Sequence, residues 1–212
     1  MQPHLPGRDC PLCPRLVAYR EEYRGLHPDW FNAPVPSFGP LAARLLVVGQ
    51  APGVNGANRT GRPFTGDVAG RLLYPVLGKF GFAKGVFKER PDDGLNLVDC
   101  RVTNAVRCAP PQHRLETSDK NHCLPYLAAE IAAMPKLRVL LAIGQKAHES
   151  ILQGLKLKPG AYKFRHGAQH ALPGGLVLAD SFHTSQYNVN TGRITEAMFE
   201  EIVAGIRALL GQ

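Results

Sequence analysis

The sequence predicts an α/β fold, a three-layer α/β/α sandwich around a central parallel sheet of four strands. Four short apolar runs have the continuous hydrophobic character of strands that are buried on both faces. Segments with helical apolar spacing alternate with these runs, which is typical of a parallel sheet covered on both sides. The chain shows no internal repeat, low-complexity tract or linker, so residues 1–212 are predicted to form a single domain.

The predicted elements follow one another regularly along the chain. The strands are expected at residues 45–49, 98–104, 138–143 and 176–180. The helices are expected at residues 14–25, 69–82, 118–134, 145–152 and 194–210. Pro14 suits the first turn of its helix, and Ser118 is the predicted N-cap of the third helix. Residues 154–170 are basic and interrupted by glycines, and residues 181–192 are predicted to form a functional loop.

Charge and hydropathy limit the class of protein. The net charge of +8 fits a polyanionic partner, although charge alone does not identify one. No apolar run approaches the roughly 20 residues that cross a bilayer, and the N-terminus lacks the apolar segment of a secretory signal. We therefore expect a cytoplasmic protein without a membrane partner.

The cysteines suggest a metal site. Cys10 and Cys13 form a C-x-x-C pair, whereas Cys108 and Cys123 lie much later in the chain. In a reducing compartment such cysteines bind metal more often than they form disulfides. Four thiolates suit either tetrahedral zinc or a 4Fe–4S cluster, and the spacing does not separate these two. Cys100 lies within an apolar run and is predicted to be a buried strand residue.

Polar groups follow three of the predicted strands. In open α/β sheets the functional site lies beyond the carboxyl ends of the strands, so groups that are distant in sequence meet there. The long glycine-rich loop after the first strand lacks the G-K-[ST] sequence of a triphosphate-binding loop. The candidate residues at this edge are Gly49, Gln50, Ala51, Phe64, Asp67, Asn104 and His183.

Four stretches resemble the uracil-DNA glycosylase superfamily, and family 5 (type B) within it. They read GQAPGVNGANRTGRPFTGD, HTSQYNVNTGRITEAMF, CPLCPRLVAYRE and VTNAVRCAPP, and together they extend over nearly the whole chain. The resemblance implies a four-stranded parallel sheet between helices. It also implies a structural 4Fe–4S cluster on Cys10, Cys13, Cys108 and Cys123. The expected activity is hydrolysis of the bond between a flipped uracil and its sugar, with double- and single-stranded DNA as partners and a monomeric protein.

The chemistry assigns a role to each candidate residue. Phe64 offers a face for stacking on the flipped base, and Asn104 offers an amide that matches the uracil edge. His183, with the backbone amides of Gln50 and Ala51, is expected to stabilise charge on the departing base. Ala51 replaces the acid or amide of relatives with a stronger first motif, so the attacking water is expected to be oriented by Asp67 or Asn104, with Asp67 ranked first.

Each of these side chains also has a purely structural interpretation. Asp67 can cap the following helix, Asn104 can satisfy backbone groups at the end of a strand, and Phe64 can pack in the core. A non-catalytic protein that binds DNA or senses damage is the alternative function.

The contacts with DNA are expected from basic and polar residues near the site. Thr184, in place of the proline usual in the family, is expected to loosen the loop that enters the minor groove. The resemblance leaves the range of bases open, with hypoxanthine and other modified bases beside uracil. The predicted DNA-binding residues are Arg59, Arg62, Arg165, Ser185 and Gln186.

Overall fold

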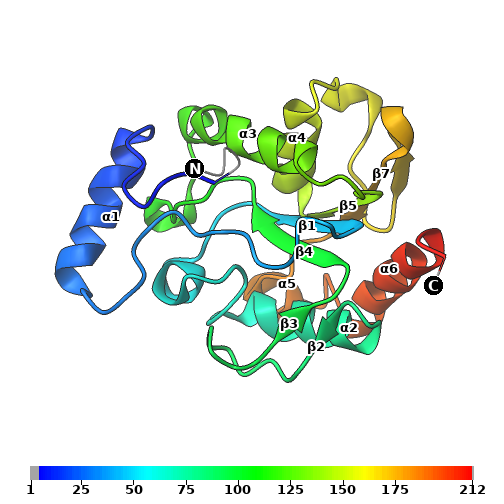
Figure 1. Cartoon of the computed structure of the whole chain (residues 1–212), viewed down its shortest axis with the longest axis horizontal. Helices are drawn as coiled ribbons and strands as arrows, with labels where there is room; N and C mark the ends of the chain where they lie inside the picture. Colours follow the sequence, from blue (N-terminus) through cyan, green and yellow to red (C-terminus); the bar gives the residue numbers. More distant parts are fainter. Residues whose placement is uncertain (1–4, 212) are drawn as a thin grey trace.

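The computed structural model describes residues 5–211 and has the predicted three-layer arrangement. A five-stranded sheet with the order β4-β1-β5-β7-β6 lies between two layers of helices (Figure 1). Its strands are β1 (Leu45–Gly49), β4 (Cys100–Asn104), β5 (Val139–Ile143), β6 (Gln169–Ala171) and β7 (Val177–Ser181). A separate two-stranded sheet joins β2 (Ala83–Lys84) to β3 (Asn96–Leu97).

The four predicted strands are β4, β1, β5 and β7, and they are parallel to one another. The central strands β1 and β5 are buried along their whole length, as their continuous apolar sequences predict. The prediction of four strands is corrected to five, because β6 adds an antiparallel edge strand beside β7. Apolar patterning missed β6, since its three residues are partly exposed and mostly polar.

The helices cover the two faces of the sheet and divide the core into two clusters. Figure 1 shows α3 and α4 on one side, where Leu127 and Ile151 pack with Leu46 and Leu140. On the other side α2 and α6 pack over the opposite faces of the same strands. The helices are α1 (Pro14–Leu26), α2 (Val68–Lys79), α3 (Thr117–Ala132), α4 (Gln145–Gly154), α5 (Gln186–Asn190) and α6 (Glu196–Leu209).

Two helix positions differ from the sequence prediction. The N-cap of α3 is Glu116 rather than Ser118, because Glu116 and Asp119 form a reciprocal capping box. The short helix α5 lies within residues 181–192, which were expected to be a loop. Within residues 5–211, none of the helices combines the length and hydropathy that a membrane crossing requires.

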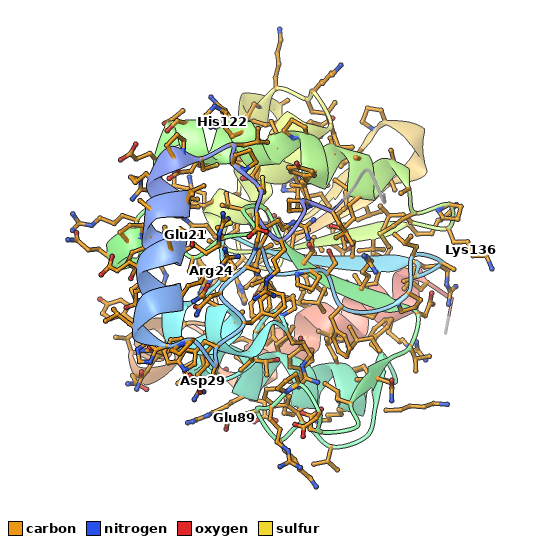
Figure 2. All side chains as sticks on the ribbon, turned by 60° about the vertical axis from the view of Figure 1, so that its left-hand side comes forward. Glu21, Arg24, Asp29, Glu89, His122 and Lys136 are labelled. Carbon is orange, nitrogen blue, oxygen red and sulfur yellow. The ribbon has the colours of Figure 1, made fainter. Side chains whose placement is uncertain are left out.

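Helix α1 stands beside the sheet rather than on either face (Figure 1). It packs through Leu16 against Val106 and Cys123, in a small third cluster. Figure 2 shows His122 of α3 near the first turns of α1, with Glu21 and Arg24 further along α1. Helix α1 is thus attached to the segments that carry Cys108 and Cys123.

The free edge of β4 is also covered by backbone pairing. The N–H of Phe38 donates to the carbonyl of Val102 at 2.9 Å, and the N–H of Val102 donates to the carbonyl of Phe38 at 2.8 Å. Both edges of the central sheet therefore end in antiparallel contacts.

Candidate active site

A cavity of about 460 Å³ opens at the carboxyl ends of β1, β4 and β7. This is the edge at which open α/β sheets place their ligands. The residues that line it come from the loop after β1, the start of α2, the end of β4, the loop after Cys108 and the segment after β7. They include Gln50, Ala51, Phe64, Asp67, Asn104, Pro110, His113, His183, Ser185 and Gln186.

Gly49 ends β1 opposite Asn104, the last residue of β4. A Cβ atom at Gly49 would lie 2.5 Å from Oδ1 of Asn104 and 2.6 Å from Cζ of Phe64. Both separations are shorter than any ordinary contact, so a side chain there would displace one of these two groups. Gly49 is not among the residues that line the cavity. The absence of a side chain at Gly49 leaves room for the Asn104 amide and the Phe64 ring. The substrate contact that was predicted for Gly49 is not seen in the lining of the cavity.

Phe64 is buried, at 6% exposed, and has a left-handed backbone with φ of 51°. This conformation is uncommon for a bulky residue and indicates that surrounding contacts hold the segment in place. The carbonyl oxygen of Phe64 lies so close to Gly70 of α2 that a Cβ atom there would overlap it. The ring borders the cavity beside Asn104, so Phe64 joins the core and the cavity wall.

Asp67 occupies the N-cap position of α2, but its side chain makes no capping hydrogen bond. Its Oδ1 atom is buried and has no hydrogen-bond partner, while Oδ2 faces Gly53 and Gly56. Burial raises the pKa of Asp67 above the ordinary value of a carboxyl group, and the nearby amides of Gly70 and Ala69 offset part of this rise. The first-turn amides of α2 thus act on this carboxylate without forming a capping hydrogen bond, and Oδ1 is left without a hydrogen-bond partner at the border of the cavity.

His183 follows β7 and packs against Gly144, the N-cap residue of α4. The carbonyl of His183 accepts a hydrogen bond of 2.8 Å from the side chain of Asn188 in α5. Burial lowers the pKa of His183, so its imidazole is neutral at neutral pH. A neutral imidazole has one N–H donor and one acceptor nitrogen to offer to a ligand.

The segment after His183 is ordered by α5. Ser185 caps this helix, with its hydroxyl accepting from the N–H of Asn188. Thr184 is fully buried, and its hydroxyl oxygen has no hydrogen-bond partner among the described residues; the expected loosening of this loop stays a prediction. Gln186 is exposed at the rim of the cavity, and Tyr187 beside it is 72% exposed.

The predicted DNA-binding arginines fall into two groups. Arg59 and Arg165 are exposed, and their contact with phosphates stays a prediction. Arg62 is only 4% exposed, and both of its terminal nitrogens bond to the carboxylate of Asp93. The predicted phosphate contact is therefore wrong for Arg62, because its guanidinium is already enclosed and paired.

His113 was not among the predicted site residues, yet it borders the cavity. It lies in a tight turn after Pro110 and Pro111, and both Gln112 and His113 have left-handed backbones, with φ of 52° and 57°. Two consecutive non-glycine residues in this region are unusual and mark a functional candidate. One feature of the sequence could have indicated His113: the loop that contains it follows β4 through Cys108 and so starts from the same edge of the sheet.

The four predicted metal ligands line one small cavity between α1, α3 and the segment after β4. Burial raises the pKa of the Cys13 thiol to about 11 and that of Cys108 to about 12. The sulfur of Cys123 accepts a hydrogen bond of 3.3 Å from the N–H of Arg107. Cys100 lies in β4, fully buried, as predicted for a strand residue.

Comparison with known proteins agrees with this geometry. A sequence model of the uracil DNA glycosylase superfamily matches residues 36–207. The chain belongs to this superfamily. The matched region contains the whole large cavity, from the loop after β1 to α5.

Individual relatives place the chain near the type-5 branch of the superfamily. A type-5 uracil-DNA glycosylase of Thermus thermophilus is 44% identical over 95% of this chain and 94% of its own length. Type-5 enzymes of Pyrobaculum aerophilum and Mycobacterium leprae are each 37% identical, over 92% and 95% of this chain and 86% and 92% of their own lengths. The resemblance predicted from the four sequence stretches is thus confirmed. The segments before residue 36, including Cys10 and Cys13, lie outside the match to the superfamily model.

Proposed function

We propose that the chain is a monofunctional uracil-DNA glycosylase that hydrolyses the N-glycosidic bond of a flipped base and leaves an abasic site. The 460 Å³ cavity supports this proposal most directly. The side chains of four residues from separate segments of the chain meet there: Phe64, Asn104, Asp67 with its unpartnered Oδ1 atom, and His183 with its neutral imidazole. A base inside a duplex is inaccessible to such groups, so the nucleotide must leave the stack. Membership of the superfamily over most of the chain agrees with this activity.

Phe64 and Asn104 recognise the base. The ring of Phe64 stacks on the extruded base, and such stacking is worth about 1–3 kcal/mol. The amide of Asn104 accepts from N3–H and donates to O4 of uracil. Gly49 leaves room for Oδ1 of this amide, because a Cβ atom there would lie 2.5 Å from it.

His183 stabilises the departing base. Cleavage of the bond leaves the electron pair on uracil and an oxocarbenium-like sugar. The neutral imidazole donates its N–H to uracil O2, where negative charge develops. The backbone amides of Gln50 and Ala51 border the same cavity and add to this effect. Removal of one donor of this kind typically slows a reaction by about 10²–10³-fold.

Asp67 directs the attack of water on the sugar. Its carboxylate accepts a proton of the water as the oxygen bonds to C1′, and its charge stabilises the cationic sugar. The unpartnered Oδ1 atom supports this role, because such a buried oxygen is costly unless it is used. The methyl group of Ala51 also borders the cavity but has no proton-transfer chemistry.

Exposed cationic and polar residues hold the DNA around the cavity. Arg59 and Arg165 contact phosphates, while Ser185 and Gln186 lie at the rim where the base leaves the duplex. The net charge of +8 favours association with either double- or single-stranded DNA.

The four cysteines that line the small cavity fit a 4Fe–4S cluster better than a zinc ion. A tetrahedral zinc ion with Zn–S bonds near 2.3 Å brings its sulfurs within about 4 Å of one another. Among the residues that the structure describes, no three of these sulfurs lie within 4.8 Å of one another. A four-iron cluster binds each thiolate at a separate iron atom, so the cysteine sulfurs around it lie farther apart than those around one zinc ion.

The cluster would be held by Cys10, Cys13, Cys108 and Cys123, and it would supply a structural cross-link between α1, α3 and the segment after β4. The chemistry of base excision remains with the residues of the large cavity.

The range of bases extends beyond uracil in this proposal. The cavity volume lies within the range of sites for small molecules and leaves room for a purine. Hypoxanthine and other deaminated bases are therefore included as substrates.

The test is excision from duplex and single-stranded oligonucleotides that carry one uracil, hypoxanthine, xanthine or ethenocytosine. Alkali-labile sites should form at uracil with the wild-type protein. Asp67→Asn and His183→Ala should still bind the same DNA but lose most of the excision. Binding without any alkali-labile site would instead favour a non-catalytic damage sensor.

A further inference from the structure

Arg62 and Asp93 form a buried ion pair outside the large cavity. The terminal nitrogens of Arg62 lie 2.8 Å and 2.7 Å from the two carboxylate oxygens of Asp93. The side chains are 5% and 0% exposed. Such a bidentate pair fixes both position and orientation.

Asp93 belongs to the segment between β2 and β3 and is itself held by backbone donors. Its carboxylate accepts from the N–H of Lys88 at 2.9 Å and from the N–H of Leu95 at 3.0 Å. The bonds from Arg62 and these amides hold the pKa of Asp93 well below its usual range, so the carboxylate stays ionised. Figure 2 shows Glu89 of the same segment at the side of the molecule away from α3.

Three aromatic rings surround the guanidinium of Arg62. Its central carbon lies 5.2 Å from the ring centre of Phe38 and 5.6 Å from the ring centres of Tyr74 and Phe87. These distances are within the range of cation–π attraction. The arrangement holds the charge of Arg62 in an enclosed box that DNA does not enter.

The same arginine reaches the residues on both sides of Phe64. Its Nε donates to the hydroxyl of Thr65 at 2.8 Å, and this hydroxyl donates to the carbonyl of Pro63 at 3.1 Å. The hydroxyl of Tyr74 donates to the same carbonyl at 2.6 Å. Phe64 is therefore held in its left-handed conformation by bonds to its two neighbours.

We propose that the Arg62–Asp93 pair is a positioning device that, through Thr65, holds Phe64 against the flipped base. Residues that touch neither DNA nor base then set the rate of excision. This inference rests on the proposed function, because it assigns a determinant of rate to the same site. It predicts that the segment between β2 and β3 acts on the chemistry from outside the cavity.

The test compares Asp93→Asn with Asp99→Asn. Asp99 pairs with Arg44 in a similar way, with distances of 2.7 Å to Nε and 2.8 Å to the backbone N–H, but it lies at the opposite ends of β1 and β4 and is partly exposed. Single-turnover excision of uracil should slow at least about tenfold in Asp93→Asn, since small misplacements of reacting groups are costly. Affinity for duplex DNA with 2′-fluoro-2′-deoxyuridine, whose bond resists cleavage, should change less than about threefold. Asp99→Asn should keep the wild-type rate.

A second variant, Thr65→Val, tests the same proposal if Asp93→Asn does not fold. Thr65→Val keeps the ion pair and removes only the hydroxyl between Arg62 and Pro63. It should also slow excision. In a Phe64→Ala background, neither Asp93→Asn nor Thr65→Val should slow excision further, because their effect passes through the ring.

The position of Phe64 is also measured without any turnover. In protein labelled with fluorophenylalanine, the ¹⁹F resonance assigned through Phe64→Leu should move in Asp93→Asn and Thr65→Val but not in Asp99→Asn. Wild-type protein that excises nothing would defeat the proposed function, whereas the ¹⁹F shifts would still decide the positioning role. Equal rates in Asp93→Asn and Asp99→Asn, with an unmoved resonance, would overturn the inference.

Discussion

Replacement of Asp67 by asparagine should make the protein more stable and nearly inactive at the same time. The substitution keeps the shape of the side chain and removes a charge that burial disfavours. The carboxylate of Asp67 receives no capping hydrogen bond from α2, and its Oδ1 atom has no partner. Folding therefore leaves this charge less well solvated than it is in the unfolded chain.

The contacts of Asp67 set the expected change in stability and in excision rate. A buried polar atom without a partner costs about 1–3 kcal/mol, and the amide side chain of the variant would retain part of that cost. We therefore expect a gain of about 1 kcal/mol at pH 7, which raises Tm by about 2–4 °C in a domain of this size. The loss of the proton acceptor should slow excision by about 10²–10⁴-fold.

The stability gain of Asp67→Asn should depend on pH. The pKa of Asp67 is raised in the folded state, so the ionised carboxylate disfavours folding above that pKa. The stability advantage of Asp67→Asn should be largest at neutral pH and should shrink as the pH falls through the folded-state pKa. The wild-type excision rate should fall over the same acidic range as Asp67 becomes protonated. Thermal melts and single-turnover rates from pH 4 to 8 test this, and a variant that is less stable yet fully active would refute the reasoning.

The remaining predictions concern the cavity rim, a buried histidine and the cysteines. His113→Ala should raise KM for uracil-containing DNA several-fold with a smaller change in kcat, because His113 lies at the rim; steady-state rates measure this split. Burial is the largest single influence on the pKa of His148 and lowers it, but the hydrogen bond and charge of Asp180, together with the hydrogen bond to the carbonyl of Tyr162, outweigh burial and raise the pKa. Its contribution to stability is thus complete below its unfolded pKa and is lost as pH rises through the raised value, so the Tm advantage of wild type over His148→Gln should be larger at pH 6 than at pH 9. Cys108→Ser should lower stability and visible absorbance more than the excision rate per folded molecule; a stable, colourless and fully active variant would count against a structural cluster.

The sequence was sufficient to predict the parallel strands and most of the cavity. Strands β1 and β5 are continuous apolar runs, and their ends necessarily meet at one edge. Asp67, Asn104 and His183 were predicted because each follows or faces such an end. Strand β6 was missed because edge strands of three mostly polar residues have no apolar pattern to detect.

The role of Arg62 could not be predicted, because its partner is distant in sequence. An arginine in a glycine-rich loop near a DNA site has the features of a phosphate ligand. Asp93 lies 31 residues later, in a segment rich in charged residues and glycine. Only the folded chain brings Asp93, Phe38 and Tyr74 around the guanidinium. His113 was missed for a related reason, since its strained turn is a property of backbone angles rather than of composition.

The antiparallel contacts at the two edges of the central sheet bear on how the protein behaves at high concentration. A parallel sheet with open edges presents unpaired N–H and C=O groups that can recruit a strand from another molecule and start aggregation. Here β6 covers the edge of β7, and Phe38 covers the middle of the edge of β4. The covering segments are short: β6 has three residues, and the pairing on β4 is a single bridge at Phe38. Loss of the β6 pairing would therefore threaten solubility before it threatened the groups of the cavity, which stand at a different border of the same sheet.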